Sequence, residues 1–172
     1  MDHQPIHLVL MGVSGCGKTS VARALAQRLS WPYAEADDFH PQENKDKMAA
    51  GIALNDDDRW PWLESLSRWM SANAMAGNST VVTCSALKKS YRDLLSRSSG
   101  KVFFVHLSGP QELIAQRMSA RTGHFMPTTL LPSQFATLEQ LGEEENGITL
   151  DINASVNELA DQVIAAVKGL RK

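Results

Sequence analysis

The sequence predicts an α/β domain in which a five-stranded parallel sheet is flanked by helices. Short apolar runs, of the length of buried strands, alternate along the chain with segments whose apolar residues recur at helical spacing. This alternation favours a parallel sheet, because each connection between parallel strands lays a helix on one face. A chain of 172 residues suits one compact domain. Ligands of such sheets bind beyond the carboxyl ends of the strands, so the residues after each strand are the first candidates for a site.

The first part of the chain is predicted to form two strands and three helices. His7–Met11 is an apolar run that ends at a glycine, which is typical of a buried strand, and Tyr33–Ala36 is a weaker strand. Helices are predicted over Lys18–Leu29 and Asp56–Met75 from their apolar spacing, and over Pro41–Ala50 between a favourable proline and a glycine. The apolar stripes of the two longer helices are Val21, Leu25 and Leu29, and Leu63, Leu66, Trp69 and Met70.

The second part of the chain is predicted to add three strands and three helices. The strands are Val81–Ser85, Val102–Leu107 and Ile148–Ile152, and two of the helices are Pro110–Arg121 and Ser133–Gln140. The last helix begins at a capping box of Ser155 and Glu158, and Val156, Leu159, Val163 and Val167 share one of its faces. Ser96–Lys101 and Arg121–Pro132 are predicted to be loops.

Composition excludes several classes of function. The formal net charge is −2, so nothing draws the chain as a whole toward nucleic acid or an anionic membrane. The first apolar run, Ile6–Val13, is too short to span a bilayer and has no basic leader, so we expect a cytoplasmic protein. The two cysteines, Cys16 and Cys84, do not make a disulfide framework, and we expect both to be small, partly buried and reduced.

A phosphate-binding loop follows the first strand. The segment GVSGCGKT at 12–19 matches G-x-x-x-x-G-K-[ST] at every fixed position, and the strand before it and the helix after it are the required context. A chance glycine-rich turn is the alternative, which that context disfavours. Lys18 is expected to reach the β- and γ-phosphates of ATP, and the Thr19 hydroxyl to ligate Mg²⁺. The residues expected to hold ATP here are Gly12, Ser14, Gly15, Cys16, Gly17, Lys18, Thr19 and Ser20.

An acidic segment, Glu35–Pro41, follows the second strand. One carboxylate there is suited to orient or deprotonate an attacking hydroxyl, and another to hold Mg²⁺ through water. Capping of the next helix is an equally good explanation of Asp37 or Asp38. We expect Asp37 to face the phosphate loop and its neighbour Asp38, in an extended segment, to point the other way and cap the helix at Pro41. His40 taken alone is more typical of a surface or hydrogen-bonding residue.

Another acidic turn, at 56–58, precedes Arg59. Capping and the helix dipole explain the three aspartates adequately. The Arg59 guanidinium either pairs locally or grips a substrate carboxylate in a fork. The tryptophans at 60, 62 and 69 are expected in the core.

Two pairs of basic residues lie four positions apart. Lys88 and Arg92 would share a helix face, where they either bind a phosphate or carboxylate or form an ordinary solvated face. Arg117 and Arg121, followed by His124, are expected on a mobile lid that neutralises the transferred phosphoryl group, the alternative being a solvent-facing helix end.

The chain resembles the gluconokinases, relatives of shikimate kinase and the nucleoside monophosphate kinases. The resemblance runs from Leu8 to about Asp151. The matching segments are GVSGCGKTS at Gly12–Ser20, DDFHP at Asp37–Pro41, NKDKMAAGIALNDDDRWPWL at Asn44–Leu63, CSALKKSYRD at Cys84–Asp93, RTGHFMP at Arg121–Pro127 and SQFATLE at Ser133–Glu139. The phosphate loop is common to many families, whereas the combination of DDFHP, LNDDDR and CSALKK is far more specific. One departure is Glu35, where we expect aspartate in many relatives.

The resemblance implies a P-loop kinase fold and the transfer of phosphate from ATP, with Mg²⁺, to the 6-hydroxyl of D-gluconate. It also implies a substrate-binding cap at about 41–78, a lid at about 117–134 and a homodimer. The expected catalytic residues are Lys18, Asp37 and Arg121. The expected substrate contacts are Asp37, His40, Arg59, Lys88 and His124, the expected metal-side residues are Thr19 and Glu35, and Arg117 and Arg121 are expected to contact ATP.

Two other functions stay open on the sequence alone. The first is a kinase for another small hydroxy acid or for a nucleoside monophosphate. The acidic and polar DDFHP and NDDDR segments suit a polyhydroxy acid better than a base. The second is a nucleotide-dependent switch, against which the expected lid arginines argue because they favour chemistry within the chain.

Overall fold

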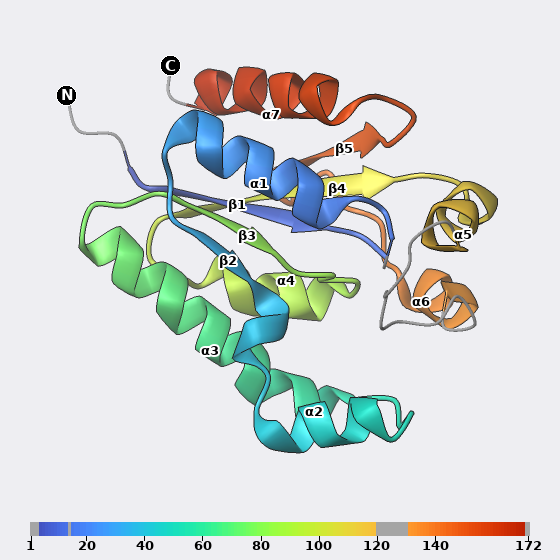
Figure 1. Ribbon diagram of the computed structural model, residues 1–172. Coiled ribbons are helices and arrows are strands. Elements are labelled where there is room, and N and C mark those ends of the chain that lie inside the picture. Colours follow the sequence, from blue (N-terminus) through green and yellow to red (C-terminus); the bar gives the residue numbers. More distant parts are fainter. Residues whose placement is uncertain (1–3, 14, 120–130, 171–172) are drawn as a thin grey trace.

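The protein folds as a five-stranded parallel sheet between two layers of helices (Figure 1), which confirms the predicted fold class. A computed structural model describes residues 4–13, 15–119 and 131–170. The strand order is β2-β3-β1-β4-β5, and every pair is parallel. The strands are β1 (Ile6–Met11), β2 (Tyr33–Glu35), β3 (Thr80–Thr83), β4 (Lys101–Ser108) and β5 (Gly147–Asp151). The helices are α1 (Lys18–Leu29), the 3₁₀ helix η1 (Ala36–Phe39), α2 (Gln42–Ala49), α3 (Asp56–Met75), α4 (Lys89–Ser96), α5 (Gln111–Ser119), α6 (Leu131–Thr137) and α7 (Val156–Leu170).

Strand β1 lies at the centre of the sheet, and all six of its residues are buried. Its side chains alternate between two apolar clusters. Leu8 and Leu10 pack on the α1 and α7 side, and Val9 and Met11 pack on the α3 and α4 side. Figure 1 shows these two helix layers on opposite faces of the sheet. Burial on both faces explains why the strand is a continuous apolar run rather than an alternating one.

Helices α1 and α3 have the predicted bounds, and most other elements differ from prediction by one or two residues. Helix α6 differs more, because it ends at Thr137 and includes Pro132, which was predicted to be loop. Proline is favoured in a first helical turn, and Leu131 beside it is buried, so the helix has both a start signal and an apolar anchor there. On α7 the predicted capping box is confirmed, but Val156 is exposed rather than part of the apolar face.

The segment after β2 was predicted wrongly. Ala36–Phe39 forms a 3₁₀ helix, not an extended strand end, and the amide of His40 bonds to the carbonyl of Asp37. Alternation of side chains between two faces therefore does not apply to Asp37 and Asp38. Helix α2 begins after Pro41 with no side-chain cap, so Asp38 does not cap it.

Both cysteines are buried and unpaired, as reduced residues. Cys16 belongs to the cluster on the α1 side of the sheet and Cys84 to the cluster on the α3 side. Of the tryptophans, Trp62 is buried, which confirms the prediction, while Trp60 and Trp69 pack partly buried against the same cluster. Among the described residues, no helix combines the length and the apolar composition that crossing a membrane requires.

Two histidines are buried within the sheet. His7 contacts the hydroxyl of Thr80 at 2.6 Å and the carbonyl of Ser99 at 2.8 Å. His106 is 1% exposed, and its Nδ1 has no hydrogen-bond partner among the described residues. Burial is the main reason that the pKa of His106 falls to about 4, and the nearby charges of Arg92 and Lys18 lower it further. Burial likewise lowers the pKa of His7.

These histidines predict a loss of stability in mild acid. The unfolded chain binds a proton at each histidine near pH 6.5, whereas folded His106 binds one only near pH 4. The contribution of these histidines to the free energy of unfolding is therefore fully present above pH 6.5. It is lost as the pH drops toward 4, by up to about 1.4 kcal/mol per pH unit for each histidine. Urea unfolding at pH 7.5, 6.5 and 5.5 measures the slope, which should be smaller in His106→Leu. An unchanged slope in that variant would mean that His106 is already protonated when folded.

Candidate active site

The phosphate loop leaves β1 in a conformation that requires glycine. Gly12 has φ 141°, and a Cβ there would lie 2.8 Å from both the Cys16 Sγ and the Leu107 carbonyl oxygen. Its amide bonds to the carbonyl of Ser85 at 3.1 Å, which ties the loop to the end of β3. Gly17 has φ 100° and precedes α1, whose N-terminus has no side-chain cap. The first amides of α1 and the positive end of its dipole are thus available for an anion.

Lys18 and Thr19 stand at the start of α1, where the sequence places the phosphate ligands. The Lys18 ammonium donates to the carbonyls of Gly12 and Val13, at 2.9 and 3.0 Å, so it lies over the loop. The Thr19 hydroxyl donates to Glu35 Oε1 at 2.9 Å. Because its hydrogen points at Glu35, the oxygen of Thr19 keeps its lone pairs for a cation. Gly15, Cys16 and Ser20 lie in the same loop and first turn, and Ser14 lies outside the described residues.

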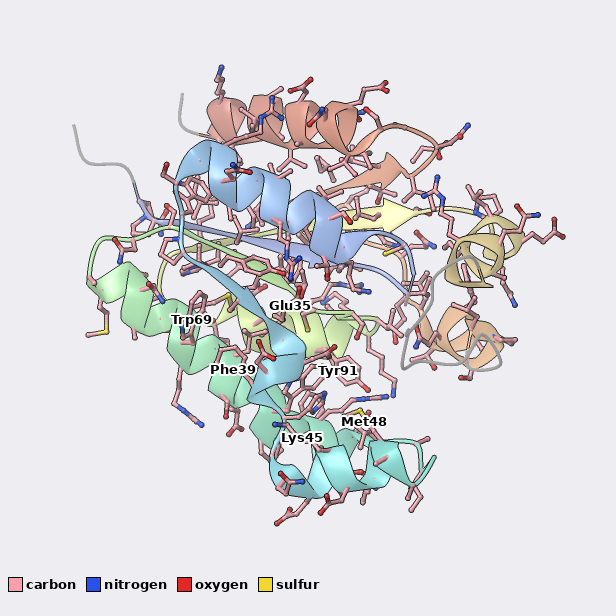
Figure 2. All side chains as sticks on the ribbon, viewed as in Figure 1. Glu35, Phe39, Lys45, Met48, Trp69 and Tyr91 are labelled. Carbon is pink, nitrogen blue, oxygen red and sulfur yellow. The ribbon has the colours of Figure 1, made fainter. Side chains whose placement is uncertain are left out.

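Glu35 lies at the end of β2 (Figure 2). Its carboxylate is the centre of a small polar cluster, because it accepts hydrogen bonds from Thr19, Tyr33 and Thr83. Burial acts to raise the pKa of Glu35, but these three hydrogen bonds and the charge of Arg23 outweigh burial and lower it. An ionised carboxylate beside a threonine hydroxyl supplies the oxygen ligands that Mg²⁺ prefers, so the predicted metal-side residues fit that ion.

Asp37 lies in η1, within electrostatic reach of Lys18. Its carboxylate is accessible to solvent, yet loss of hydration to the surrounding protein raises its pKa. Lys18 acts against this rise, while Glu35 and Asp38 reinforce it. A carboxylate with a raised pKa is a stronger base than an ordinary one, so Asp37 is suited to accept a proton from a hydroxyl. The case for Asp37 thus comes from lost hydration and from the nearby Lys18, and not from strand alternation.

His40 is fixed as a neutral ring. It stacks on Trp62 with ring centroids 4.1 Å apart, and its Nδ1 lies 3.2 Å from Asn44 Nδ2. The same Asn44 nitrogen donates to the Asp58 carbonyl at 2.8 Å, and a carbonyl can only accept, so this nitrogen is the amide donor. The Nδ1 of His40 therefore accepts, and the proton lies on Nε2. Burial, helped by Arg59 and Lys45, lowers the pKa of His40 to about 4.

A pocket of about 450 Å³ opens where α3 begins. Its lining residues are Leu54, Asn55, Asp56, Asp57, Arg59 and Lys88. A capping box formed by Asn55 and Asp58 starts α3 here, with hydrogen bonds of 2.8 and 3.0 Å. This cap sets the position of Arg59 in the first turns of the helix. Lys88 comes from the loop after β3, so the pocket brings together two cations that are far apart in the sequence.

Tyr91 joins the charged groups of this pocket, and sequence reasoning missed it. Its hydroxyl accepts from Arg59 at 2.7 Å and donates to Asp56 at 2.5 Å. Lys88 pairs with Asp56 at 3.2 Å, and both cations lie 5.5 Å from the centre of the Tyr91 ring. Figure 2 shows Tyr91 between the sheet and α2. Its position three residues after Lys88, within CSALKKSYRD, was the available signal, since residues three apart are neighbours on a helix.

The remaining basic residues have different environments. Arg92 is fully buried and paired with Glu145, so both readings of it, as a ligand contact and as a solvated cation, are wrong. A helix of eight residues packed on the sheet turns this position inward. Arg117 in α5 donates to the carbonyl of Ile152 at 3.2 Å. Arg121 and His124 lie outside the described residues.

Comparison with known proteins places this site in a family. A family model described as shikimate kinase matches residues 14–168. The gluconokinase of Gluconobacter oxydans is 48% identical over 84% of this chain and 82% of its own length. The chain belongs to the gluconokinase family. A crystal structure of a gluconokinase from Sinorhizobium meliloti shares 42% identity, with a TM-score of 0.87 over 98% of this chain and 95% of that one. An unliganded sugar kinase from Janibacter shares 51% identity, with a TM-score of 0.91 over 95% of each chain.

The match to the shikimate kinase family model begins at residue 14 and covers the site from there on, while Gly12 lies just before it. The family-model match includes the helix that carries Lys18, the η1 segment with Asp37, and the pocket with Arg59 and Lys88. The resemblance found from DDFHP, LNDDDR and CSALKK is thereby confirmed at the level of the family.

The geometry around His40 predicts a definite tautomer. Two-bond ¹H–¹⁵N spectra at pH 7 should show His40 protonated at Nε2 and not at Nδ1, with no titration above about pH 5, because Nδ1 accepts from Asn44 and burial disfavours the charge. Asn44→Asp should reverse the pattern, since a carboxylate accepts from Nδ1–H and raises the pKa. A His40 that titrates near pH 6.5 in the unaltered protein would contradict this assignment.

Proposed function

We propose that this protein transfers the γ-phosphate of ATP to the 6-hydroxyl of D-gluconate, giving 6-phospho-D-gluconate and ADP. The observation that carries the proposal is the pairing of two sites on one edge of the fold. One is a P-loop with Lys18, and the other is a pocket whose cations, Arg59 and Lys88, suit a carboxylate. The gluconokinase names of relatives such as that of Gluconobacter oxydans, 48% identical, support the choice of gluconate.

On this proposal, each residue near the phosphate loop has a distinct task. Lys18 and the first amides of α1 hold the phosphates and offset the charge that spreads over the transferred group. The oxygen of the 6-hydroxyl bonds to the γ-phosphorus while the bond between that phosphorus and the ADP oxygen breaks. Asp37 accepts the proton that the hydroxyl loses. Thr19 and Glu35 are the residues that would hold Mg²⁺, directly or through water, and Mg²⁺ supplies charge neutralisation on the phosphates.

The other half of the substrate would be held at the start of α3. Arg59 from α3 and Lys88 from the loop after β3 line the pocket and would attract the carboxylate of gluconate. His40 does not line this pocket, but it is held neutral with its proton on Nε2, so it would donate to a sugar hydroxyl that reaches it. The aspartates of the pocket, Asp56 and Asp57, offer acceptors for hydroxyl groups. A polyhydroxy acid has all of these complementary groups.

Several finer features belong to the same proposal and rest on the family resemblance. They are a substrate-binding cap at about 41–78, a lid at about 117–134 from which Arg117, Arg121 and His124 act, a homodimer, and a cytoplasmic location. In Figure 1, α2 and the start of α3 extend away from the sheet, in the region proposed as the cap.

The pocket disfavours a nucleoside monophosphate as the acceptor. A base would need an aromatic face for stacking. Tyr91 adjoins the pocket, but Arg59 and Lys88 both lie over its ring at 5.5 Å from the centroid. A different hydroxy acid of similar size is the stronger second candidate, because its carboxylate would use the same two cations.

An ATP-consumption screen tests the proposed function. The acceptors are D-gluconate, other aldonic acids, shikimate and nucleoside monophosphates, and the product is identified by mass and by its phosphorus spectrum. Consumption that depends on gluconate and yields the 6-phosphate is the expected result, and Lys18→Ala should reduce it to near background because the phosphates lose their closest cation. Faster turnover of any other acceptor would replace gluconate in the proposal.

Asp37→Asn should lower kcat by roughly 10²–10⁴-fold and leave the affinity for ATP nearly unchanged, because it removes a general base and keeps the shape. Asp38→Asn is the matched control, since Asp38 is exposed and caps no helix, and it should be close to normal. Steady-state kinetics of both variants measure the difference. If kcat fell in Asp38→Asn and stayed near normal in Asp37→Asn, Asp38 and not Asp37 would be the general base.

Arg59→Met should raise KM for gluconate by roughly 10- to 100-fold, the value of one or two charge-assisted hydrogen bonds, with little change in KM for ATP. Arg68→Met is the control on the same helix, because Arg68 does not line the pocket and, among the described residues, its hydrogen bond goes to Ser65 in its own turn. Equal effects of the two substitutions, or an effect of Arg59→Met on ATP alone, would remove Arg59 from the gluconate site.

A further inference from the structure

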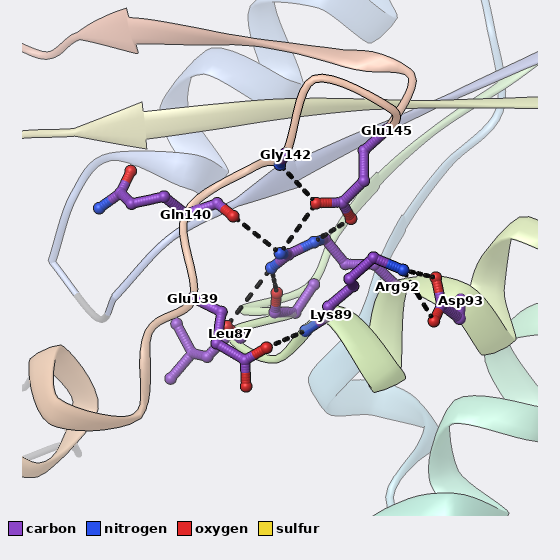
Figure 3. A network of polar contacts seen from close by, with 9 residues as sticks. Leu87, Lys89, Arg92, Asp93, Glu139, Gln140, Gly142 and Glu145 are labelled. Carbon is purple, nitrogen blue, oxygen red and sulfur yellow. Dashed lines mark hydrogen bonds and ion pairs between the residues drawn. The ribbon is translucent and has the colours of Figure 1, made fainter.

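Arg92 is a buried cation near the site, and every nitrogen of its guanidinium forms a hydrogen bond (Figure 3). It is 0% exposed, and it forms a two-pronged ion pair with Glu145 through Nε at 2.7 Å and Nη2 at 3.2 Å. Its Nη1 donates to the carbonyls of Ala86 at 2.8 Å and Leu87 at 3.3 Å. Its Nη2 also donates to the carbonyl of Gln140 at 3.3 Å. All three nitrogens are therefore used, and none is left for a substrate.

These bonds join two segments that are distant in the sequence. One is the loop at 84–88 between β3 and α4, and the other is the segment at 139–145 between α6 and β5. The amide of Glu139 donates to the Leu87 carbonyl at 2.7 Å, and the Glu139 carboxylate accepts from the amide of Lys89 at 3.3 Å. Figure 3 shows Arg92 between the two segments, with Glu145 reached from one side and Leu87 from the other.

The loop that Arg92 holds is part of the candidate active site. Ser85 accepts the hydrogen bond from Gly12 at the start of the phosphate loop, and Lys88 lines the pocket. Between them Ala86 has φ 45°, a left-handed conformation that is costly for a residue with a Cβ. Such a conformation persists only where its surroundings impose it, and the Arg92 bonds to the carbonyls of Ala86 and Leu87 do so.

A need for stability alone does not explain a buried arginine here. Well-packed apolar residues often replace a buried ion pair without loss of stability, whereas no apolar side chain can hold three carbonyls and a carboxylate in fixed directions.

We propose that Arg92 is a positioning residue for the reaction: it fixes the loop at 84–88 in the shape that presents Lys88 to the pocket. This inference rests on the proposed function. Its effect is expected on gluconate more than on ATP, because Lys88 depends on the loop directly, while the phosphate loop is also held by β1 and α1.

Arg92→Lys is the decisive substitution, since a lysine keeps the charge but cannot bond to Glu145 in a fork and to the loop carbonyls together. KM for gluconate should rise roughly tenfold, with KM for ATP changed by less than about twofold. Val163→Ala is the matched control: it removes buried apolar atoms from α7, on the opposite face of the sheet, and should leave both KM values unchanged. Equal KM values in Arg92→Lys and Val163→Ala would overturn the proposal.

A double-mutant cycle with Lys88→Met tests whether Arg92 acts through Lys88. If it does, Arg92→Lys adds little to the KM for gluconate once Lys88 is absent, whereas independent effects would multiply. Multiplying effects would overturn the stated route. If Arg92→Lys does not fold, Glu145→Gln takes its place, because it weakens the ion pair and keeps the shape.

Amide hydrogen exchange separates this inference from the proposed function. Residues 84–88 should exchange faster in Arg92→Lys than in Val163→Ala, at equal overall stability, whatever the substrate proves to be. If the screen finds no turnover of gluconate but the loop exchange behaves as expected, the proposed function fails and the positioning of the loop stands. Unchanged exchange at 84–88 refutes the positioning itself.

Discussion

The central strand β1 is the constraint on which the rest of the structure depends. All six of its residues are buried between two helix layers, so the strand cannot shift its register without exposing apolar side chains. Its carboxyl end therefore has one fixed place, beside the ends of β3 and β4. Gly12 follows at once, and the space around it is too small for any Cβ. The position of the phosphate loop thus follows from apolar burial, and Lys18 and Thr19 inherit that position through α1.

The ion pairs that hold the polar groups of the site differ in how much they contribute to stability. The ion pairs of Lys88 with Asp56 and of Lys89 with Asp93 are exposed, and solvent screening leaves such pairs with little effect on stability. The pair of Arg92 with Glu145 is buried, with side chains 0% and 7% exposed, and removal of one partner of such a pair typically costs about 3–5 kcal/mol. The part of the pocket wall with the stronger support is therefore the loop at 84–88, to which Arg92 is hydrogen-bonded. The exposed groups of the pocket, which pair weakly with one another, can exchange their partners for a ligand.

Local sequence patterns predicted the elements whose signals lie within one turn or one strand. The bounds of α1 and α3 were predicted from apolar spacing, and the phosphate loop from its glycines and its neighbouring strand and helix. The 3₁₀ helix at Ala36–Phe39 was not predicted, because Trp62 of α3 donates from its indole nitrogen to the Ala36 carbonyl, a contact across 26 positions that no local pattern reports. The same limit hid the role of Tyr91, whose partners Asp56 and Arg59 lie on another helix.

The sequence by itself determined the fold class, the phosphate loop and the family, because these depend on apolar periodicity and on short motifs of fixed spacing. Only the tertiary structure decided how the charged residues divide between site and core. Lys88 and Arg92 belong to the same motif and carry the same charge, yet one lines the pocket and the other is buried against Glu145. What separates them is the packing of α4 on the sheet, which places Arg92 within reach of a carboxylate 53 positions away. Burial and the location of the opposite charge are properties of the folded chain. Only the folded structure therefore decides whether a basic residue can contact a ligand or instead holds a loop in position.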